Sequence, residues 1–327
     1  MKSPQIPENE FERTRALDEL GVVYSPAEAR FDRIVRLAKK FFKVKSVLVS
    51  LVYGEEQWFK ARQGLNTPCT PRDISFCGHA ILNDGPFVIE NALEDDRFSD
   101  NPLVLGPPHI RFYAGQPIHN RFGVTLGTLC LLHNEPRAFS HEDRKDLRDF
   151  AKLVEGELAK RAASPVVDDF LALLDSKQRA ALLEPLTGAW NAAGIEEVLT
   201  RELRACRSRE FGLSAMKIRL RGYSDLHERF GQDRVADILK FAAANIRDCV
   251  LESASLAYLG KGEFFLVCPF HDHEKHFQTQ SDLKFLFAQS LLETQGIQAL
   301  VEIDINAVLI ESEPQIAKGA AHWISTL

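Results

Sequence analysis

The sequence lacks any long apolar run and any recognisable secretion signal. None of its 327 residues lies in a stretch that approaches the ~18 to 20 consecutive apolar residues of a membrane helix. The first twelve residues, MKSPQIPENEFE, also lack the basic and apolar regions of a signal peptide. We therefore expect a cytoplasmic protein with no membrane partner.

Closely spaced cysteines are missing as well. The six cysteines are scattered along the chain, and no two of them form a C-x-x-C pair: Cys69, Cys77, Cys130, Cys206, Cys249 and Cys268. A chain of this size folds without disulfide staples, and structural zinc sites usually have closely spaced ligands. The pattern predicts reduced thiols.

Positive charge is in deficit, because the formal net charge is -6. A nucleic-acid-binding surface needs clustered Lys and Arg to neutralise phosphates, so we expect no nucleic-acid partner. What the sequence does contain is ordinary globular composition, 45% hydrophobic and 26% charged, over a length that suits two domains.

The first 160 residues predict one antiparallel sheet with helices packed on it. AEARFDRIVRLAKKFF spaces its apolar residues as a helix does, and SVLVSLVYG then changes to a β-branched strand pattern. Further strands are predicted at 57–62, 87–90, 111–119 and 124–132. The turns between them carry the Gly, Pro, Asn and Asp residues that bends require.

A long helix is predicted after Ser140, a good N-cap whose following acids suit a helix N-terminus. Its apolar stripe, Leu147, Phe150, Val154 and Leu158, has two interpretations: it packs on its own domain, or it forms a parallel dimer helix. Because proline ends helices, we expect a first domain at 1–160, a helical connector at 161–184 and a second domain at 185–327.

The segments PRDISFCGHAI (71–81), FVIENALEDDRFSDNPLVLGPPHIRFYAGQPI (87–118) and TLGTLCLL (125–132) closely resemble the GAF domain family. The resemblance covers about residues 15 to 160 and implies an antiparallel sheet with a ligand pocket roofed by loops and short helices. GAF domains are usually small-molecule or cofactor sensors. The ligand here is an unidentified small molecule, and no tightly bound cofactor is expected.

Five residues in these segments are candidates for the pocket, because they combine aromatic walls with a few polar groups: Phe76, Cys77, His79, Arg111 and Tyr113. Arg111 could hold an anion, or it could pair with an acid in the run 94–96. His79 could equally be a structural helix residue. Cys77 and Cys130 are either buried apolar thiols or a redox sensor.

The second half alternates helix and strand patterns from Gly194 onward, which predicts an α/β domain with a central sheet flanked by helices. The fold class of the whole chain is therefore α+β. EPLTGAWNAAGIEEVL (184–199) and the hairpin YLGKGEFFLV (258–267) resemble the GGDEF, or diguanylate cyclase, family over about residues 184 to 312. Active members join two GTP molecules into cyclic di-GMP, with one GTP in each half of a dimer.

The hairpin departs from the family pattern G-G-[D/E]-E-F, because it reads Gly260, Lys261, Gly262, Glu263, Phe264. The metal-binding acid of the third position is Gly262, and Lys261 stands where glycine normally lets nucleotide approach. The first strand departs too: Arg219 and Arg221 occupy the two acid positions of D-x-D-x-F-K. Phosphoryl transfer of this kind needs carboxylates that hold divalent ions, so we expect no metal site.

Other family positions are also lost by this resemblance. His227 replaces a residue that helps to recognise guanine, and Ala236 stands at another base-recognition position. Leu251 and Ala254 occupy the R-x-x-D product-inhibition site, which therefore lacks its arginine. A zinc site at His271, His273 and His276 is the weaker alternative to a polar turn, since the spacing matches no strong metal motif.

The charge of the substituted residues indicates whether cyclase activity is weakened or abolished. Exchanging an acid for Arg within ~4 Å of a divalent ion turns attraction into repulsion of several kcal/mol, whereas a tenfold rate loss needs only about 1.4 kcal/mol. The sequence thus predicts a bacterial-type signalling homodimer whose GAF sensor controls an inactive GGDEF-like domain that contacts an unidentified signalling protein. An active diguanylate cyclase and a non-catalytic GTP-binding regulator remain the alternatives.

Overall fold

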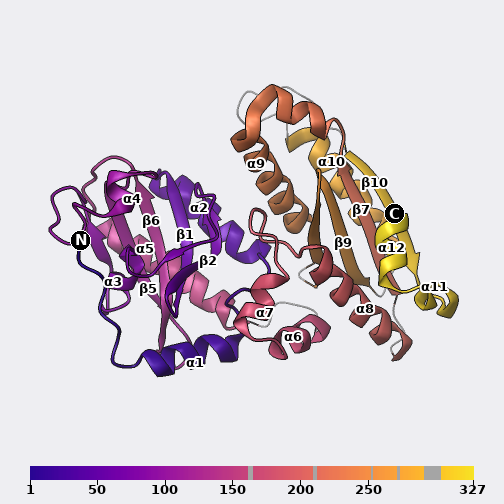
Figure 1. The fold of residues 1–327 in the computed structure, drawn as a ribbon, viewed down its shortest axis with the longest axis horizontal. Coiled ribbons are helices and arrows are strands. Elements are labelled where there is room, and N and C mark those ends of the chain that lie inside the picture. Colours follow the sequence, from indigo (N-terminus) through magenta and orange to yellow (C-terminus); the bar gives the residue numbers. More distant parts are fainter. Residues whose placement is uncertain (161–164, 209–211, 252, 271–272, 291–302) are drawn as a thin grey trace. The chain divides into compact units, whose positions relative to one another are not determined.

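The computed structural model describes residues 1–160, 165–208, 212–251, 253–270, 273–290 and 303–327. The chain divides into two compact units, Met1–Arg161 and Ala162–Leu327, and Figure 1 colours the first from indigo to magenta. Each unit combines a sheet with helices, as the sequence predicts. Within the described ranges, no helix has both the length and the apolar character that crossing a membrane requires.

The first unit contains a six-stranded sheet in the order β3-β2-β1-β6-β5-β4. All neighbouring strands in it are antiparallel, which confirms the predicted antiparallel sheet. The strands are β1 Ser46–Tyr53, β2 Glu56–Gln63, β3 Cys69–Pro71, β4 Phe87–Ile89, β5 Phe112–His119 and β6 Thr125–His133.

The helices of this unit lie on both faces of the sheet (Figure 1). One face packs against α1 Glu10–Leu20, α2 Ala29–Phe42 and α5 His141–Leu158, and the other against α3 Phe76–Ala80 and α4 Pro102–Leu105. The period-two alternation of β1 explains both cores, because Val47, Val49 and Leu51 face α2 and α5, while Leu48 and Val52 face α3.

Helix α5 begins as the sequence predicts. The Ser140 hydroxyl accepts a hydrogen bond from the Asp143 backbone N–H, and the Asp143 carboxylate accepts one from the Ser140 N–H, which completes a capping box. Leu147, Val154 and Leu158 are buried in the core of this unit. The apolar stripe therefore packs on its own domain.

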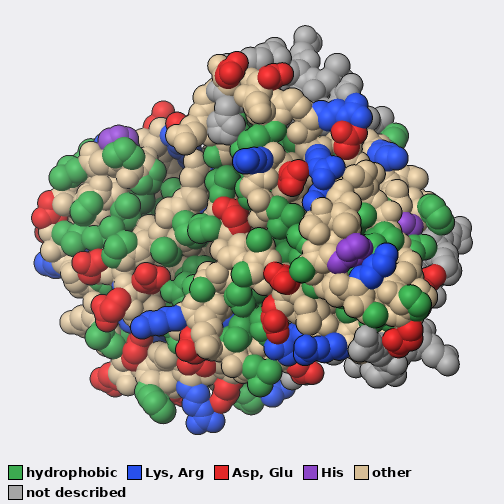
Figure 2. All heavy atoms as spheres, turned by 45° about the vertical axis from the view of Figure 1, so that its right-hand side comes forward, with side chains coloured by type: hydrophobic (Ala, Val, Ile, Leu, Met, Phe, Trp, Pro, Cys, Tyr) green, Lys and Arg blue, Asp and Glu red, His purple; other side chains and the backbone are tan. Residues whose placement is uncertain are grey.

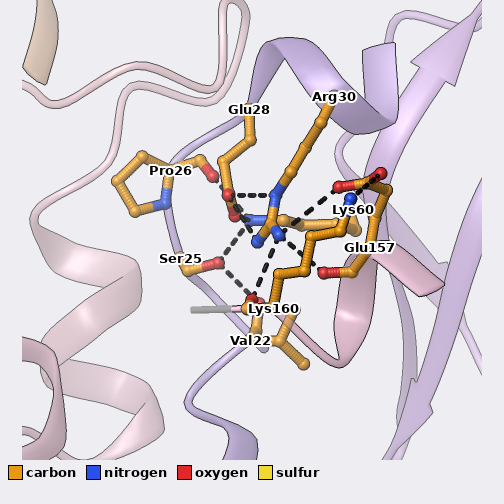
Figure 3. Close-up of polar contacts among 8 residues, drawn as sticks. All are labelled: Val22, Ser25, Pro26, Glu28, Arg30, Lys60, Glu157 and Lys160. Atoms are coloured by element: carbon orange, nitrogen blue, oxygen red, sulfur yellow. Dashed lines mark hydrogen bonds and ion pairs between the residues drawn. The ribbon is translucent and has the colours of Figure 1, made fainter. Parts of the chain in front are cut away.

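A buried ionic cluster, which the sequence did not reveal, joins β2 to the end of α5 (Figure 3). The Lys60 side chain is fully buried, and its Nζ donates to Ser25 Oγ at 2.6 Å and pairs with Glu28 Oε1 at 2.5 Å. Arg30 also pairs with Glu28, at 2.8 Å, and donates to the Glu157 carbonyl at 2.6 Å. Burial lowers the pKa of Lys60, and Glu28 opposes that shift.

The second unit contains a sheet of four described strands in the order β10-β7-β9-β8, with every neighbouring pair antiparallel. They are β7 Gly212–Leu220, β8 Ser255–Gly260, β9 Glu263–Phe270 and β10 Ile303–Ile310. One face packs against α9 Tyr223–Cys249 and α10 His273–Ser290, and the other against α8 Ala192–Ser208, α11 Glu313–Ala317 and α12 Ala320–Thr326. The predicted central sheet flanked by helices is confirmed.

The segment expected to connect the domains forms two short helices, α6 Pro165–Ala172 and α7 Ser176–Ala181. Phe170 of α6 packs on Trp190, with ring centroids 6.1 Å apart, and the Arg201 guanidinium lies 4.5 Å from the centre of the Phe170 ring. Helix α6 thus contributes to the core of the second unit. Residues 161–164 of the expected connector lie outside the described part of the chain.

Candidate functional site

The first unit encloses a cavity of about 250 Å³ on the sheet face that carries α3 and α4. Apolar and aromatic side chains dominate its wall, as is usual for small-molecule sites. The lining residues are Leu48, Gln57, Phe59, Leu65, Thr67, Thr70, Phe76, Cys77, Leu103, Pro107, Pro108, Ile110, Tyr113, Cys130 and Leu132. Strand β2 and the loop after it contribute lining residues that the sequence alone did not single out.

Three of the five pocket candidates line this cavity. Phe76 stacks on Tyr113, with ring centroids 5.1 Å apart, and Cys77 follows Phe76 on α3. His79 and Arg111 are not among the lining residues. The His79 ring contacts the Lys2 carbonyl at 2.9 Å, and Arg111 donates to the Val104 carbonyl at 2.8 Å rather than to an acid of the run 94–96. Both side chains hold neighbouring backbone.

A pair of thiols lies in the cavity wall. Cys77 Sγ and Cys130 Sγ are 3.6 Å apart, and the Tyr113 hydroxyl donates to Cys77 Sγ at 3.3 Å. Burial by itself raises the pKa of Cys77, but hydrogen bonds from Cys130, Thr128, Tyr113 and Ser50 outweigh it and lower the pKa to about 7. Burial and the neighbouring Cys77 raise the pKa of Cys130 instead.

Two further hydroxyls lie beside the thiol pair. Ser50 on β1 and Thr128 on β6 are register partners in the sheet, and both are completely buried. Leu48 and Cys130 form the pair two residues along, so Ser50, Thr128 and Cys130 point to the same face. Neither hydroxyl forms a well-aligned hydrogen bond, and Thr128 lies close enough to Cys77, Cys130 and Tyr113 to affect the pKa of all three. Buried hydroxyls usually form such a bond, so this arrangement leaves donors available at the sulfur.

The hairpin between β8 and β9 has three successive residues with positive φ: Gly260 at 90°, Lys261 at 51° and Gly262 at 75°. The Gly262 N–H donates to the Tyr258 hydroxyl at 3.2 Å. A Cβ added at Gly262 would lie 2.8 Å from Cδ2 of Tyr223 and 2.9 Å from its Cγ. The Tyr223 ring therefore occupies the space that a side chain at position 262 would need.

The charged groups at this end of the sheet neutralise one another. Arg219 on β7 is the register partner of Glu263 on β9, and its Nε donates to Glu263 Oε1 at 2.9 Å. Arg221 pairs with Asp304 of β10, with an Nε to Oδ2 distance of 2.6 Å. The hydrogen bond from Arg221 lowers the pKa of Asp304. Arg219 and Arg221, the two arginines that the resemblance aligns with acid positions, thus each hold a carboxylate of this chain.

These residues do not fit the divalent ions that the GGDEF family uses. Glu263, the acid that keeps the hairpin pattern, is already paired with Arg219. Among the residues that the structure describes, no three His, Cys, Asp or Glu side chains form a group suited to a metal ion. The prediction that positions 219, 221 and 262 hold no metal ion is argued from these two arginine–carboxylate pairs and from the lack of an acid at Gly262.

The structure places two of the three remaining predicted sites of nucleotide or product recognition. Ala236 is half-buried on α9, beyond a kink at Gly231 where φ is 74°. Leu251 is half-exposed and Ala254 half-buried in the turn before β8, where the Ala254 N–H donates to the Leu251 carbonyl at 2.9 Å. The side chain of His227 lies outside what the structure describes.

The histidine-rich segment at the start of α10 is described only in part. His271 and the side chain of His273 lie outside the described residues. His276 is buried and contacts Ser214 Oγ at 2.6 Å through Nδ1 and Gln280 Nε2 at 2.7 Å through Nε2. Both of its ring nitrogens are therefore engaged in hydrogen bonds within the fold.

Two family models match the chain: the GAF domain over residues 26–158 and the diguanylate cyclase, GGDEF domain over residues 181–321. A cyclic di-GMP phosphodiesterase of Pseudomonas aeruginosa, PA2567, is 38% identical over 170 residues, which are 52% of this chain and 29% of that protein. A second from the same organism, NbdA, is 29% identical over 106 residues, 32% of this chain and 14% of its own length. The chain spans less than a third of either relative.

Solved structures that resemble part of the chain include GGDEF domains from Pseudomonas aeruginosa. The GGDEF domain of PA1120 is 20% identical, covers 42% of this chain and 88% of its own, and has a TM-score of 0.37. The GGDEF domain of FimX is 18% identical, covers 44% and 91%, and has a TM-score of 0.39. The family matches and their order along the sequence decide the assignment: this chain carries a GAF domain followed by a GGDEF domain.

Proposed function

We propose that this is a cytoplasmic signalling protein in which the GAF domain senses a small molecule and the GGDEF domain acts without making cyclic di-GMP. One observation carries the proposal: Arg219, at a family metal position, forms an ion pair with Glu263, the acid retained in the hairpin. The positive group lies where a divalent ion would have to bind, and it engages the carboxylate that such an ion would need.

The steric arrangement supports the same conclusion independently of charge. An aspartate or glutamate at position 262 would have to displace the Tyr223 ring, because even a Cβ would approach it to 2.8 Å. Real Cβ atoms do not come that close, so the hairpin has packed around the missing acid. Several substitutions and a movement of Tyr223 would be needed to rebuild the family's metal site.

The output of such a domain is contact with protein. Its sheet packs against helices through two hydrophobic cores, one on each face, so the fold is kept while Arg219 and Arg221 are paired at the end of the sheet. We expect a homodimer whose GGDEF surface meets an unidentified signalling protein, and a change in the GAF cavity would alter that contact. Figure 2 shows acidic and basic side chains interspersed on the face it displays, which suits a protein partner better than a nucleic acid.

The relatives support a role in cyclic di-GMP signalling. Two proteins that share sequence with this chain are named as cyclic di-GMP phosphodiesterases, and the matched segments are small parts of their lengths. Their activity stays with those proteins. For this chain we infer a regulatory role in the same signalling system, with the GGDEF domain as an interaction module.

The test is to incubate the full chain with GTP and Mg²⁺ or Mn²⁺ and to measure cyclic di-GMP by mass spectrometry, beside an active cyclase. We expect no product above the protein-free control. Enzyme-dependent product would overturn the proposal and favour the sensor-regulated cyclase. Saturable GTP binding without product, altered by Arg219→Asp, would identify the GTP-binding regulator instead.

A further inference from the structure

The thiol pair of the GAF cavity belongs to the buried core of its unit and has no part in the proposed output, yet hydroxyl groups surround its sulfurs. We propose that Cys77 is oxidised by a hydroperoxide that carries an apolar substituent and enters the GAF cavity, and that Cys130 then closes a disulfide with it. The inference rests on the geometry around Cys77 Sγ and on the chemistry of the cavity. It does not depend on the state of the GGDEF hairpin.

The surroundings of Cys77 are built for a sulfur anion. The Tyr113 hydroxyl donates to its Sγ at 3.3 Å, and the buried Ser50 and Thr128 hydroxyls beside it form no well-aligned hydrogen bond elsewhere. A neutral thiol is a weak acceptor and makes poor use of three hydroxyl donors, whereas a thiolate accepts them strongly. The two hydroxyls without well-aligned hydrogen bonds are therefore explained if Cys77 works as the thiolate.

The other cysteines provide an internal comparison, since the structure describes all six. Burial raises the pKa of Cys268 to about 12 and that of Cys206 to about 11. Cys69 and Cys249 also have raised pKa values, with burial as the largest cause. Cys77 differs from them because donors surround its sulfur. The thiolate is the nucleophile, so oxidation is expected to select Cys77.

The cavity determines which oxidant fits. Its volume of about 250 Å³ exceeds the ~150 Å³ of an apolar cavity that admits benzene, so an aryl or branched alkyl group can enter. Phe59, Phe76 and Leu132 provide an apolar wall. The side-chain amide oxygen of Gln57, Oε1, is buried without a hydrogen-bond partner in a residue of the same lining, and it can accept a hydrogen bond from the O–H of a hydroperoxide.

The reaction balances in two steps. The Cys77 thiolate attacks the terminal oxygen of ROOH, the S–O bond forms as the O–O bond breaks, and the alkoxide takes a proton from solvent to leave as ROH. The Cys130 thiol, whose sulfur lies 3.6 Å away, then attacks the Cys77 sulfenic acid. The S–S bond forms, water leaves, and the hydroperoxide has been reduced by the two electrons that the thiols lost.

The test uses the reduced full chain, treated with cumene hydroperoxide and separately with hydrogen peroxide, followed by peptide mapping. We expect a Cys77–Cys130 disulfide, formed at least about tenfold faster with the apolar oxidant because its substituent leaves water on entering the cavity. Cys130→Ser should stop the reaction at a Cys77 sulfenic acid that dimedone labels. Cys77→Ser should leave Cys130 reduced, and Cys206→Ser should behave as the wild type.

Three results would overturn the proposal. Oxidation of Cys77 no faster than that of Cys206 would remove the reactive thiolate, and a dimedone adduct absent from Cys130→Ser would remove the first step. A faster reaction with hydrogen peroxide than with cumene hydroperoxide would reject the apolar substrate class. Peptide mapping of the wild type needs no variant, and circular dichroism of each variant establishes that it is folded.

Discussion

The GAF cavity and the GGDEF hairpin differ in what their polar groups are doing. Next to the thiols of the cavity wall, the buried hydroxyls of Ser50 and Thr128 form no well-aligned hydrogen bond and lie beside a sulfur that can become an anion. At the hairpin, Arg219 already holds Glu263, and Tyr223 fills the space above Gly262. The GAF cavity thus has hydroxyl groups without well-aligned hydrogen bonds and space for a ligand. At the hairpin, the charged groups pair with each other and a side chain fills the space.

Under the function that we propose, that difference distinguishes a site kept for a ligand from one that no longer binds one. Leaving a buried polar group unpaired costs about 1 to 3 kcal/mol, so its presence needs a compensating reason such as a ligand or a charged state. A site that has lost its ligand has no such reason, and its charges pair with each other. The ion pairs of Lys60 and Arg219 also differ, because the Lys60 side chain is fully buried while both members of the Arg219 pair are 35 to 40% exposed.

The largest effect is expected at the buried ion pair behind the cavity. Lys60 follows Phe59, which lines the cavity, and its side chain supports β2 from the opposite face. Lys60→Met removes the buried donor to Ser25 Oγ and to the Pro26 carbonyl, and it leaves Glu28, which is 26% exposed, with Arg30 as its remaining cation. We expect the GAF domain to lose about 3 to 5 kcal/mol of unfolding free energy. Urea unfolding measures this, with Lys152→Met as the exposed control, which should lose at most about 1 kcal/mol.

If Lys60→Met and Lys152→Met destabilise the domain equally, the buried Lys60 cluster does not stabilise β2 and the cavity wall. If Cys77 of the Lys60→Met variant still reacts with cumene hydroperoxide at the wild-type rate, the reactivity of Cys77 does not depend on the stability of β2. The expected result is a slower reaction, because Gln57 and Phe59 on the same strand line the cavity.

The next largest loss of stability is expected from a side chain at position 262 of the hairpin, which would clash with Tyr223. Gly260 and Gly262 both have positive φ, at 90° and 75°, but a Cβ meets nothing within 4 Å at Gly260 and meets Tyr223 at Gly262. Alanine at either position costs about 1 kcal/mol of backbone strain, and Gly262→Ala should cost about 1 to 3 kcal/mol more. Thermal unfolding of the two variants measures the difference.

A second substitution isolates the contact itself. Adding Tyr223→Ala to Gly262→Ala should restore the stability that Gly262→Ala loses beyond Gly260→Ala. Adding Tyr223→Ala to Gly260→Ala should restore none. Equal costs for the two glycine substitutions, or additive behaviour of Gly262→Ala with Tyr223→Ala, would show that the ring does not fill the space required by an acid at this position.

The pH dependence of thiol oxidation sharpens the account of the cavity. Because the pKa of Cys77 is about 7, the thiolate fraction and the oxidation rate should rise about tenfold per pH unit below 7 and level off above it. Two titratable groups face Cys77, namely Cys130 and Tyr113. Both have raised pKa values, so they stay protonated in this range. Stopped-flow oxidation from pH 5.5 to 8.5 gives the profile. A rate that keeps rising to pH 8.5 would mean an ordinary thiol.

The smallest effect is expected at the exposed ion pair of the hairpin. Arg219→Ala removes the partner of Glu263, yet the unfolding free energy should change by no more than about 1 kcal/mol because solvent screens the pair. The variant should also remain without cyclic di-GMP synthesis, since Gly262 and Arg221 are unchanged. Chemical unfolding and a product assay check both parts, and product from this single variant would mean that Arg219 alone blocks an otherwise complete site.

Much of the fold could be predicted because its signals are local. The alternation in β1, the capping residues Ser140 and Asp143, and the helix and strand order of the second half all appear in the sequence and in the structure. The two closing helices were not foreseen, since Trp323 of α12 is buried through contacts distant in the chain. The cluster around Lys60 was also missed, because residues 28, 60 and 157 meet only through the tertiary fold.

The candidate sites were predictable to a different degree. Motif positions identified Phe76, Cys77 and Tyr113, which line the cavity, but Ser50, Gln57 and Thr128 carry no motif and are found only through sheet register. His79 and Arg111 have the right chemistry for a pocket, but their side chains turn to the carbonyls of Lys2 and Val104. A side chain's direction depends on neighbours that a single sequence does not reveal.

The most direct measurement of the central claim follows Mn²⁺ by electron paramagnetic resonance while the full chain is titrated into Mn²⁺ and GTP. The account predicts a Mn²⁺–GTP spectrum that the protein leaves unchanged, because Arg219 and Arg221 pair with the nearby acids and position 262 provides none. A broadened, protein-bound spectrum that disappears with Glu263→Gln would contradict it, since the hairpin would then hold the ion that we infer it has lost.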